Sequence, residues 1–473
     1  MEIAEYRKKL EQQGGWLNDE SCRARLVYIN GRFVPQLSKS NEVAHNLDSL
    51  DAASDEVKSY LSRLTDGFTD ELAAPVPMGD KFLTSYKKLS GPDHALGEPT
   101  SQFAINTQQG TACFAALNTI RTGAVACIQV EQAEKYEESN QPILVVNAIT
   151  KDGGSVSSDE KGVSIHPRCL VVAGENSRLS FIQSCVDLDT DCEERPKLYN
   201  GYTQIFVKGG SNVTHAYLEE SGGLVTSGVE QSDDDIEDGQ PLPREVEAAR
   251  APLKDTHLEA IDVHVIGDDG TYEGTIMSVG GSGRVRIAHS VSLLRPGSQA
   301  KINGFSLSGG AQRTDCKTNI HHVAQGTKSE QIQKSMIGGR ATGSFRGRIR
   351  VEQSAQQTDS QQLSRTVLLS DRSRAWAVPS LEIIADDVKC THGATVSDLS
   401  EEELFYLRSR GLDRKLARNL LMFAFAGDVC SCVDQAMLGS LESNSGLRAR
   451  IIQRLENLVP QGDRAIQGEF QSI

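Results

Sequence analysis

The sequence predicts a mainly β protein whose core is a parallel β-helix, with an N-terminal α+β region before it and a helical region after it. Between about residues 105 and 390 of the 473-residue chain, short β-rich runs alternate with Gly, Asn, Asp and Ser. Helical periodicity is almost missing from this stretch and returns after Thr395. We therefore expect an N-terminal domain over 1–105, a β-helix core over 106–395 and a C-terminal helical domain over 396–473.

The N-terminal domain contains one clear hairpin signal. The apolar run Leu26 to Ile29 is followed by Asn30 and Gly31, and a second run starts at Arg32. Asn-Gly between two short apolar runs is the strongest local signal for a two-residue β-turn.

In the central region a tight turn followed by a polar and apolar alternation recurs. It occurs at Gly174 to Phe181, Gly209 to Thr214, Gly281 to Ile287 and Pro296 to Ile302. Such recurrence suits either a β-sandwich or a parallel β-helix. The length of the region favours the β-helix, because a sandwich of that size would normally split into domains.

One insertion interrupts the core at about 229–255. Its stretch from Ser232 to Pro243 is rich in acid and proline and poor in apolar residues. We interpret it as a surface loop. A cation-binding role is less favoured, because the acids lack the alternating spacing and the glycine of a calcium loop.

The composition excludes several function classes. The chain has 49 basic and 64 acidic residues and a net charge of −15, which disfavours nucleic acid or an anionic membrane as the main partner. Its apolar runs, such as Leu420 to Ala426, are far shorter than the roughly 20 residues that cross a bilayer. The 10 cysteines lack the spacing of a secreted disulfide scaffold, so we expect reduced thiols in a soluble intracellular protein.

The helical tail has defined boundaries. Ser400 and Glu403 form a capping box, and Gly411 provides a stop. A second helix is expected after Asp413, and a third is expected over Leu447 to Leu458. Helices in this place either cover the end of the β-helix or dock a partner.

Cys390 and His392 form the candidate site. In an extended strand, residues two apart point to the same face, so this pair can present a thiolate and an imidazole to one metal or cluster. Two ligands are too few for a closed site, and the others must come from elsewhere in the chain or from another protein. The alternative is a buried cysteine beside a hydrogen-bonded histidine.

Motifs of other chemistries are missing from the sequence. The chain has no GxxxxGK[ST] loop, GxSxG elbow, HExxH helix or dinucleotide fingerprint, so we expect it to bind no nucleotide itself. The glycine-rich run from Gly338 to Gly347 is interpreted as turn glycines of the β-helix. His321 and His322 alternate faces in a strand, which favours a structural role for them.

Three segments resemble the SufB/SufD family. Glu382 to Val396 followed by Leu404 to Gly411 is similar to the C-terminal signature of that family. Ile29 to Val34 with Leu37 and Ser38, and Leu170 to Asn176, are similar to two earlier family segments. The resemblance extends from about residue 25 to 430, and the acidic insertion is the main departure.

This resemblance implies a right-handed parallel β-helix and a non-catalytic role in iron–sulfur cluster assembly. It implies pairing with the paralogue SufB through the β-helix cores, and docking of the ABC-type ATPase SufC, which binds the nucleotide, on the C-terminal helices. A sulfur-donor system would act indirectly, through SufB. The expected home is a plastid stroma or a bacterial cytoplasm.

The resemblance also assigns roles to residues. His392 is the implied ligand of a transient iron–sulfur cluster shared with SufB, with Cys390 as a second candidate. The implied SufC-docking residues are Leu404, Phe405, Tyr406 and Arg408. Two alternatives stay open: a purely structural subunit in which His392 packs the interface, and a β-helix carbohydrate-acting enzyme, which would need acids with Arg or Lys on one face.

Overall fold

The computed structural model describes residues 3–12, 22–48, 52, 117–118, 121–131, 141–150, 163–188, 196–221, 255–281 and 283–437. The acidic stretch from Ser232 to Pro243 and the predicted third helix lie outside these residues, as does the expected boundary near residue 105. The division into three domains therefore stays a prediction.

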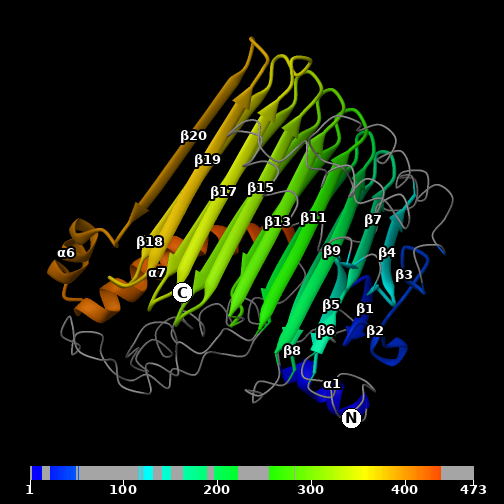
Figure 1. Ribbon diagram of the computed structural model, residues 1–473, viewed down its shortest axis with the longest axis horizontal. Coiled ribbons are helices and arrows are strands. Elements are labelled where there is room, and N and C mark those ends of the chain that lie inside the picture. The colour runs from blue at the N-terminus through cyan, green and yellow to red at the C-terminus, as the bar shows by residue number, and fades with distance from the viewer. Residues whose placement is uncertain are drawn as a thin grey trace, which may run out of the picture.

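The described chain is a parallel β-helix, as the sequence predicts, built from two long sheets (Figure 1). Each rung places one strand in each sheet. Sheet A contains, in spatial order, β2 (Arg32–Phe33), β1 (Ala24–Ile29), β5 (Ile143–Ile149), β8 (Arg178–Asp187), β10 (Asn212–Glu220), β12 (Thr271–Ser278), β14 (Gln299–Ser308), β16 (Lys328–Ile337), β18 (Asp359–Leu368) and β20 (Lys389–Ser397).

Sheet B contains β19 (Arg374–Ile383), β17 (Thr342–Val351), β15 (Arg313–His322), β13 (Arg284–Leu293), β11 (Thr256–Val265), β9 (Lys197–Val207), β7 (Arg168–Ala173), β4 (Val125–Val130) and β3 (Ala44–Leu47), with β6 (Val163–Ile165) beside β9. The described helices are α1 (Ile3–Gln12), the short 3-10 helix η2 (Pro35–Leu37), α6 (Glu401–Ser409) and α7 (Arg414–Met437).

The predicted N-terminal hairpin is confirmed. β1 pairs antiparallel with β2, and Asn30 and Gly31 between them have φ angles of 50° and 75°. Both residue types tolerate this left-handed backbone, which a two-residue hairpin turn requires. β1 also pairs in parallel with β5, so the hairpin continues sheet A.

The turn phrases at Gly174, Gly209 and Pro296 form corners where the chain passes from sheet B to sheet A, whereas the phrase at Gly281 leads into β13 of sheet B. At five of the corners from sheet B to sheet A, a buried hydroxyl donates a hydrogen bond to the backbone carbonyl three residues earlier. The bonds are Ser177 to Gly174 (2.7 Å), Ser211 to Lys208 (2.5 Å), Ser298 to Arg295 (2.6 Å), Thr327 to Ala324 (3.2 Å) and Thr358 to Ala355 (2.8 Å). Each bond satisfies a carbonyl that the turn removes from the sheet ladders.

The interior between the sheets is packed in columns, because equivalent residues of successive rungs pair in register. One column is wholly buried and consists of Ile205, Val263, Val291, Ile320 and Ile349. β-branched side chains suit such stacking on a pleated surface.

Helices cover the outer face of sheet A. Met422 and Ala426 of α7 and Leu10 of α1 belong to a second buried apolar cluster, formed with residues on the outer side of that sheet. Lys334 of β16 anchors α7 by donating a hydrogen bond to the Phe425 carbonyl (3.0 Å), and its ammonium lies 4.9 Å from the centre of the Phe425 ring. Sheet A is therefore fixed between the interior core and α7.

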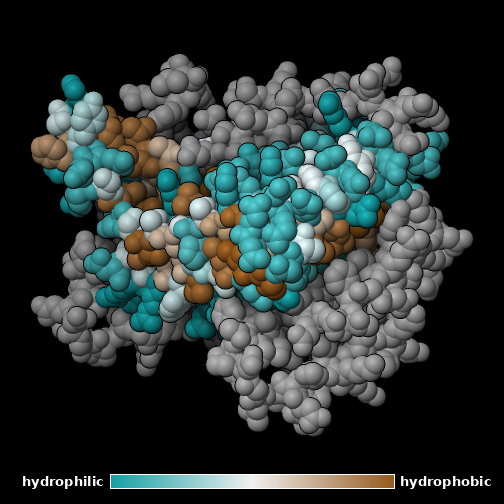
Figure 2. All heavy atoms as spheres, turned by 90° about the horizontal axis from the view of Figure 1, so that it is seen from above, coloured by the Kyte–Doolittle hydropathy of each residue, from teal (hydrophilic) through white to brown (hydrophobic). Residues whose placement is uncertain are grey.

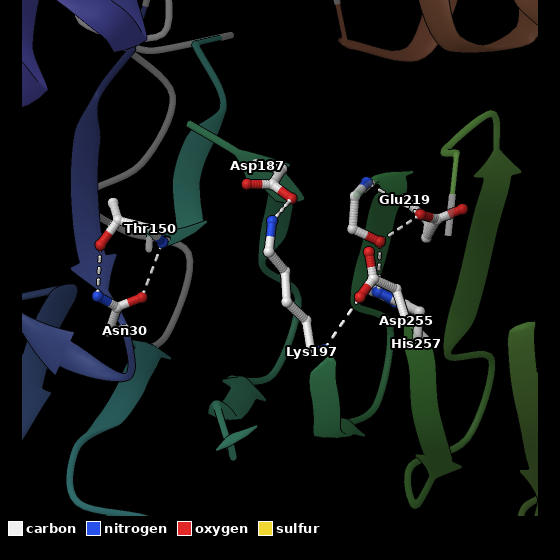
Figure 3. A network of polar contacts seen from close by, with 8 residues as sticks. Asn30, Thr150, Asp187, Lys197, Glu219, Asp255 and His257 are labelled. Atoms are coloured by element: carbon white, nitrogen blue, oxygen red, sulfur yellow. Dashed lines mark hydrogen bonds and ion pairs between the residues drawn. The ribbon is translucent and has the colours of Figure 1, made fainter. Parts of the chain in front are cut away.

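Buried polar side chains also line the interior. The Ser221 hydroxyl donates to the Glu219 carboxylate (2.5 Å) and contacts His257 Nδ1 (3.0 Å). Figure 3 shows Glu219 and His257 in this network. His257 Nε2 in turn contacts the Tyr217 hydroxyl (2.8 Å), which donates to Glu259 (3.1 Å). Burial raises the pKa of Glu259 to about 8 and lowers the pKa of His257 to about 3.

The buried histidines predict loss of stability in acid. Burial lowers the pKa of His257, His289 and His322 from 6.5 to about 3, so their neutral forms stabilise the fold fully above pH 6.5, and that stability is lost as the pH falls. Each of these rings, and His264 with a pKa lowered to about 4, should cost about 2 kcal/mol between pH 7 and pH 5, while the raised pKa of Glu259 offsets part of this loss. We therefore expect the free energy of unfolding, measured with urea, to fall by several kcal/mol over this range.

The variant His322→Gln tests the assignment, because it removes one titrating ring while glutamine can still bond Thr327 and Ser329. It should reduce the acid-dependent loss by about 2 kcal/mol. Equal unfolding free energies at the two pH values in the wild-type chain would contradict the prediction.

A second prediction concerns the close approach of neighbouring corners. A Cβ at Gly267 would lie 1.8 Å from the Gly209 nitrogen of the rung below, whereas a Cβ at Gly209 would have no neighbour within 3.5 Å apart from the Asp268 carbonyl oxygen at that distance. We expect Gly267→Ala to lower the free energy of unfolding by about 3 kcal/mol and Gly209→Ala to change it by less than about 1 kcal/mol. Thermal or urea unfolding of the matched pair measures the difference, and equal effects would show that the rungs do not pack this closely.

Candidate functional site

The β-helix ends with two strands that each have a neighbour on one side only among the described strands. β20 is the last strand of sheet A and pairs with β18, and β19 is the last strand of sheet B and pairs with β17. Figure 1 shows both at the end of the molecule opposite α1. We call this terminal rung, residues 374–397, the open end.

Cys390 and His392 lie on β20 at the open end. In register they pair with Ser360 and Gln362 of β18, whose side chains are buried in the interior. Cys390 is half-buried and packs against the interior apolar core. His392 lies two residues further on the same strand face and is exposed. The pair therefore lies on the inward side of a rung that no further described rung covers.

A row of hydroxyls leads to Cys390 from inside the β-helix. His322 Nε2 contacts the Ser329 hydroxyl (2.9 Å), and Ser329 contacts the Ser360 hydroxyl (2.7 Å). Cys390 occupies the next position of this column. Burial, with the nearby Asp359 carboxylate, raises the pKa of the Cys390 thiol above its ordinary value of 9.0. The thiol is therefore protonated near neutral pH unless a metal displaces the proton.

Apolar side chains are exposed around the open end. Trp376 and Val378 on β19 have exposed fractions of 52% and 40%, and Val396 on β20 has 44%. Ile383 and Ile384, where β19 ends, are 43% and 42% exposed. Figure 2 shows brown hydrophobic surface toward the left end of the molecule, the end at which Figure 1 places β19, β20 and α6. Apolar side chains gathered on strands with unpaired edges are typical of an interaction site.

The helix α6 follows β20 directly and begins and ends as predicted. Ser400 accepts a hydrogen bond from the Glu403 backbone N–H (3.3 Å), and Gly411 after the helix has a φ of 95°. Leu404 is buried, whereas Phe405 and Tyr406 are 73% and 57% exposed. An aromatic pair this exposed on a short helix contributes little to the core and is available to a partner.

The remaining predicted docking residue, Arg408, is exposed on α6. The neighbouring Arg410 lies over the Tyr406 ring at 5.2 Å from its centre. Where the chain turns back into α7, Arg418 donates a hydrogen bond to the Leu369 carbonyl (2.5 Å). This hydrogen bond attaches the start of α7, which follows α6, to the β-helix.

The other histidines singled out in the sequence have structural roles. His321 faces outward and contacts the Glu352 carboxylate (2.8 Å), while His322 faces inward and contacts Thr327 (2.8 Å) as well as Ser329. This confirms that the pair alternates faces. Within the described ranges, no group of three or more His, Cys, Asp or Glu side chains could hold a metal ion. No helix in those ranges is long and apolar enough to cross a bilayer.

Sequence reasoning did not identify Ser360 and Gln362, the residues beneath Cys390 and His392. A signal was present, because Ser329-Glu330-Gln331, Ser360-Gln361-Gln362 and Cys390-Thr391-His392 stand in register on three successive rungs of sheet A. The first two are the same Ser-x-Gln pattern, and the third replaces its two polar residues with metal-ligand types. An alignment of the chain with itself at a period of about 30 residues reveals the pattern.

Comparisons with known proteins point to one family. Residues 155–425, more than half of the chain, match the SufBD core domain of the SUF system for FeS cluster assembly. The chain is 27% identical over 433 residues to an iron–sulfur cluster assembly SufBD family protein of Synechocystis, covering 89% of this chain and 76% of the relative.

Two further relatives come from a plant and a bacterium. The chain is 28% identical over 377 residues to the chloroplastic protein ABCI7 of Arabidopsis thaliana, covering 79% of this chain and 68% of the relative. It is 30% identical over 200 residues to the iron–sulfur cluster assembly protein SufD of Escherichia coli, covering 42% of this chain and 45% of the relative. With the core domain matched over most of the β-helix, the chain belongs to the SufBD family of iron–sulfur cluster assembly proteins.

Proposed function

We propose that this chain is a SufD-type scaffold subunit that holds a nascent iron–sulfur cluster at its open end without catalysing a reaction itself. The observation that carries the proposal is the placement of Cys390 and His392 together on the uncovered terminal rung. The relatives named SufD support the subunit type. Because relatives occur in a chloroplast and in bacteria, the proposed home is a plastid stroma or a bacterial cytoplasm.

The chemistry of the pair suits a cluster that must be passed on. A thiolate and an imidazole are both iron ligands, and mixed sulfur and nitrogen ligation occurs in protein clusters. A cluster held by four protein ligands needs two more than this pair provides. We propose that a second subunit supplies the others, so that the cluster is cargo shared across an interface and is released when the interface opens.

The strands of the open end suggest how that subunit binds. β19 and β20 are 10 and 9 residues long and leave one edge without a described neighbour. An edge of this length with Trp376, Val378 and Val396 beside it favours strand addition by another β protein. The proposed partner is the paralogue SufB, whose β-helix would continue the two sheets.

The helix α6 suggests a second contact. Phe405 and Tyr406 are exposed beside Arg408 on a helix that projects beyond β20. Aromatic residues and arginine are the residue types that dominate binding energy at protein interfaces. We propose that this surface docks the SufC ATPase, so that nucleotide-driven movement of SufC reaches the open end through α6.

The cluster proposal predicts that His392→Ala lowers the cluster content of the reconstituted complex several-fold, because the imidazole is one of few ligands from this chain. Iron and acid-labile sulfide are measured together with the iron–sulfur absorption band. Thr391→Ala is the matched control, since Thr391 is also exposed on β20 but lies on the opposite strand face. The complex should assemble normally in both variants.

Wild-type cluster content in His392→Ala, with the complex intact, would exclude the ligand role and leave a purely structural subunit. Cys390→Ser tests the thiol separately. A loss of cluster in Cys390→Ser comparable to that in His392→Ala would assign both ligands to this chain.

The docking proposal predicts that Phe405→Ala and Tyr406→Ala each weaken SufC binding about tenfold or more, because exposed aromatic anchors contribute about 2 kcal/mol at interfaces. Isothermal titration with purified SufC measures the affinity. Glu402→Ala is the control, since Glu402 is exposed on the same helix and is acidic rather than aromatic. Undiminished SufC affinity in both aromatic variants, with thermal unfolding unchanged, would exclude α6 as the docking surface.

A further inference from the structure

One buried amide oxygen points to a residue that supports the site from within. Gln362 of β18 has an exposed fraction of 2%, and its side-chain oxygen Oε1 is buried without a hydrogen-bond partner in the described structure. Buried carbonyl oxygens are nearly always bonded, and one that lacks a partner calls for a specific reason.

The Gln362 amide is the last member of a directed row. Gln331 Nε2 donates to the Thr318 hydroxyl (2.6 Å), and Gln362 Nε2 donates to Gln331 Oε1 (2.7 Å). Both glutamines are buried and occupy the same position on the adjacent strands β16 and β18. Both amide donors of the row therefore bond residues of earlier strands, and the acceptor without a partner belongs to the last amide before β20.

The sheet opposite leaves room for this amide. A Cβ at Gly347 of β17 would lie 2.1 Å from Gln362 Nε2 and 2.7 Å from Gln362 Cδ. Glycine at this position accommodates the glutamine side chain, which with the bond to Gln331 holds the amide in one orientation. The hydrogen bonds of the row and the space at Gly347 together define the position of the Gln362 amide.

His392 is the next residue of the same column. It pairs with Gln362 in register between β18 and β20, and neighbouring strands lie about 4.8 Å apart. Side chains that pair in this way point to the same face. An imidazole N–H is a donor without ionisation, so the neutral His392 ring can satisfy the unbonded Gln362 oxygen from the paired position on β20.

We infer that Gln362 is a positioning residue for His392: its Oε1 accepts one imidazole N–H and leaves the other ring nitrogen directed to the open end. The inference rests on the proposed role of His392 as a cluster ligand. Histidines that bind metals usually donate their other N–H to an oxygen, which fixes the tautomer and the ring plane. Here the fixed amides of Gln331 and Gln362 would hold the His392 ring in one orientation.

The test uses the full-length chain without metal, with ¹⁵N-labelled histidine. The His392 ring signals are assigned by their loss in His392→Ala. The wild-type ring should give one pyrrole-type and one pyridine-type nitrogen at a pH where it is neutral, as expected for a single tautomer. In Gln362→Met the two nitrogen shifts should move toward each other, because the ring loses its acceptor and exchanges between tautomers.

Two further variants separate positioning from a general effect on the interior. Ser360→Ala removes an equally buried polar group two residues away, beneath Cys390, and should leave the His392 tautomer unchanged. Gln331→Met removes the acceptor that orients the Gln362 amide and should cause a smaller shift in the same direction. If Gln362→Met fails to fold, Gln331→Met alone decides, and an unchanged ring signal in it overturns the inference.

The outcome is independent of the cluster proposal. Identical His392 ring shifts in the wild type and in folded Gln362→Met would overturn the positioning role, whatever the cluster content of the complex. Conversely, a tautomer change in Gln362→Met together with wild-type cluster content in His392→Ala would establish the hydrogen bond and refute the ligand role.

Discussion

In-register stacking of parallel strands is the constraint on which the rest of this structure depends. Each strand pairs with its counterpart one rung away without a shift, so the residues at one position form a column through the molecule. Adjacent members of an interior column are matched, as apolar residues in Val263, Val291 and Ile320 and as hydrogen-bonded residues in Ser329 and Ser360. A polar side chain in a column is costly to bury unless a neighbouring residue bonds it.

The sequence predicts the fold well because its signals are local. The turn phrases at Gly174, Gly209 and Pro296 mark real corners, since each contains the residue with positive φ and the hydroxyl that caps the turn. The shared face of Cys390 and His392 is likewise local, as it needs only the two-residue period of a strand. Both ends of helix α6 are set by local residues, the N-cap Ser400 and Gly411 after the helix.

What sequence reasoning missed depends on pairs that are far apart in the chain. Lys334 and Phe425 meet only because α7 folds back over sheet A, and nothing near either residue indicates the other. Gln362 becomes significant only once the register places it between Gln331 and His392. The repeated Ser-x-Gln pattern contains this information, but a shift of one residue in the register would reverse its meaning, and only the complete set of strand pairings fixes the register.

The two ends of the β-helix differ in a way that bears on function. At the first end, β2 and β3 are two and four residues long and pair antiparallel, so little edge remains. Short edge strands are a common means of preventing unwanted association. At the other end, β19 and β20 extend for 10 and 9 residues, with apolar side chains beside them. A column that ends there leaves its last side chain without a stacking partner, which in the interior would be a defect. For His392 this missing neighbour is what the proposed ligand role requires, because a ligand covered on both sides could neither receive a cluster nor release one.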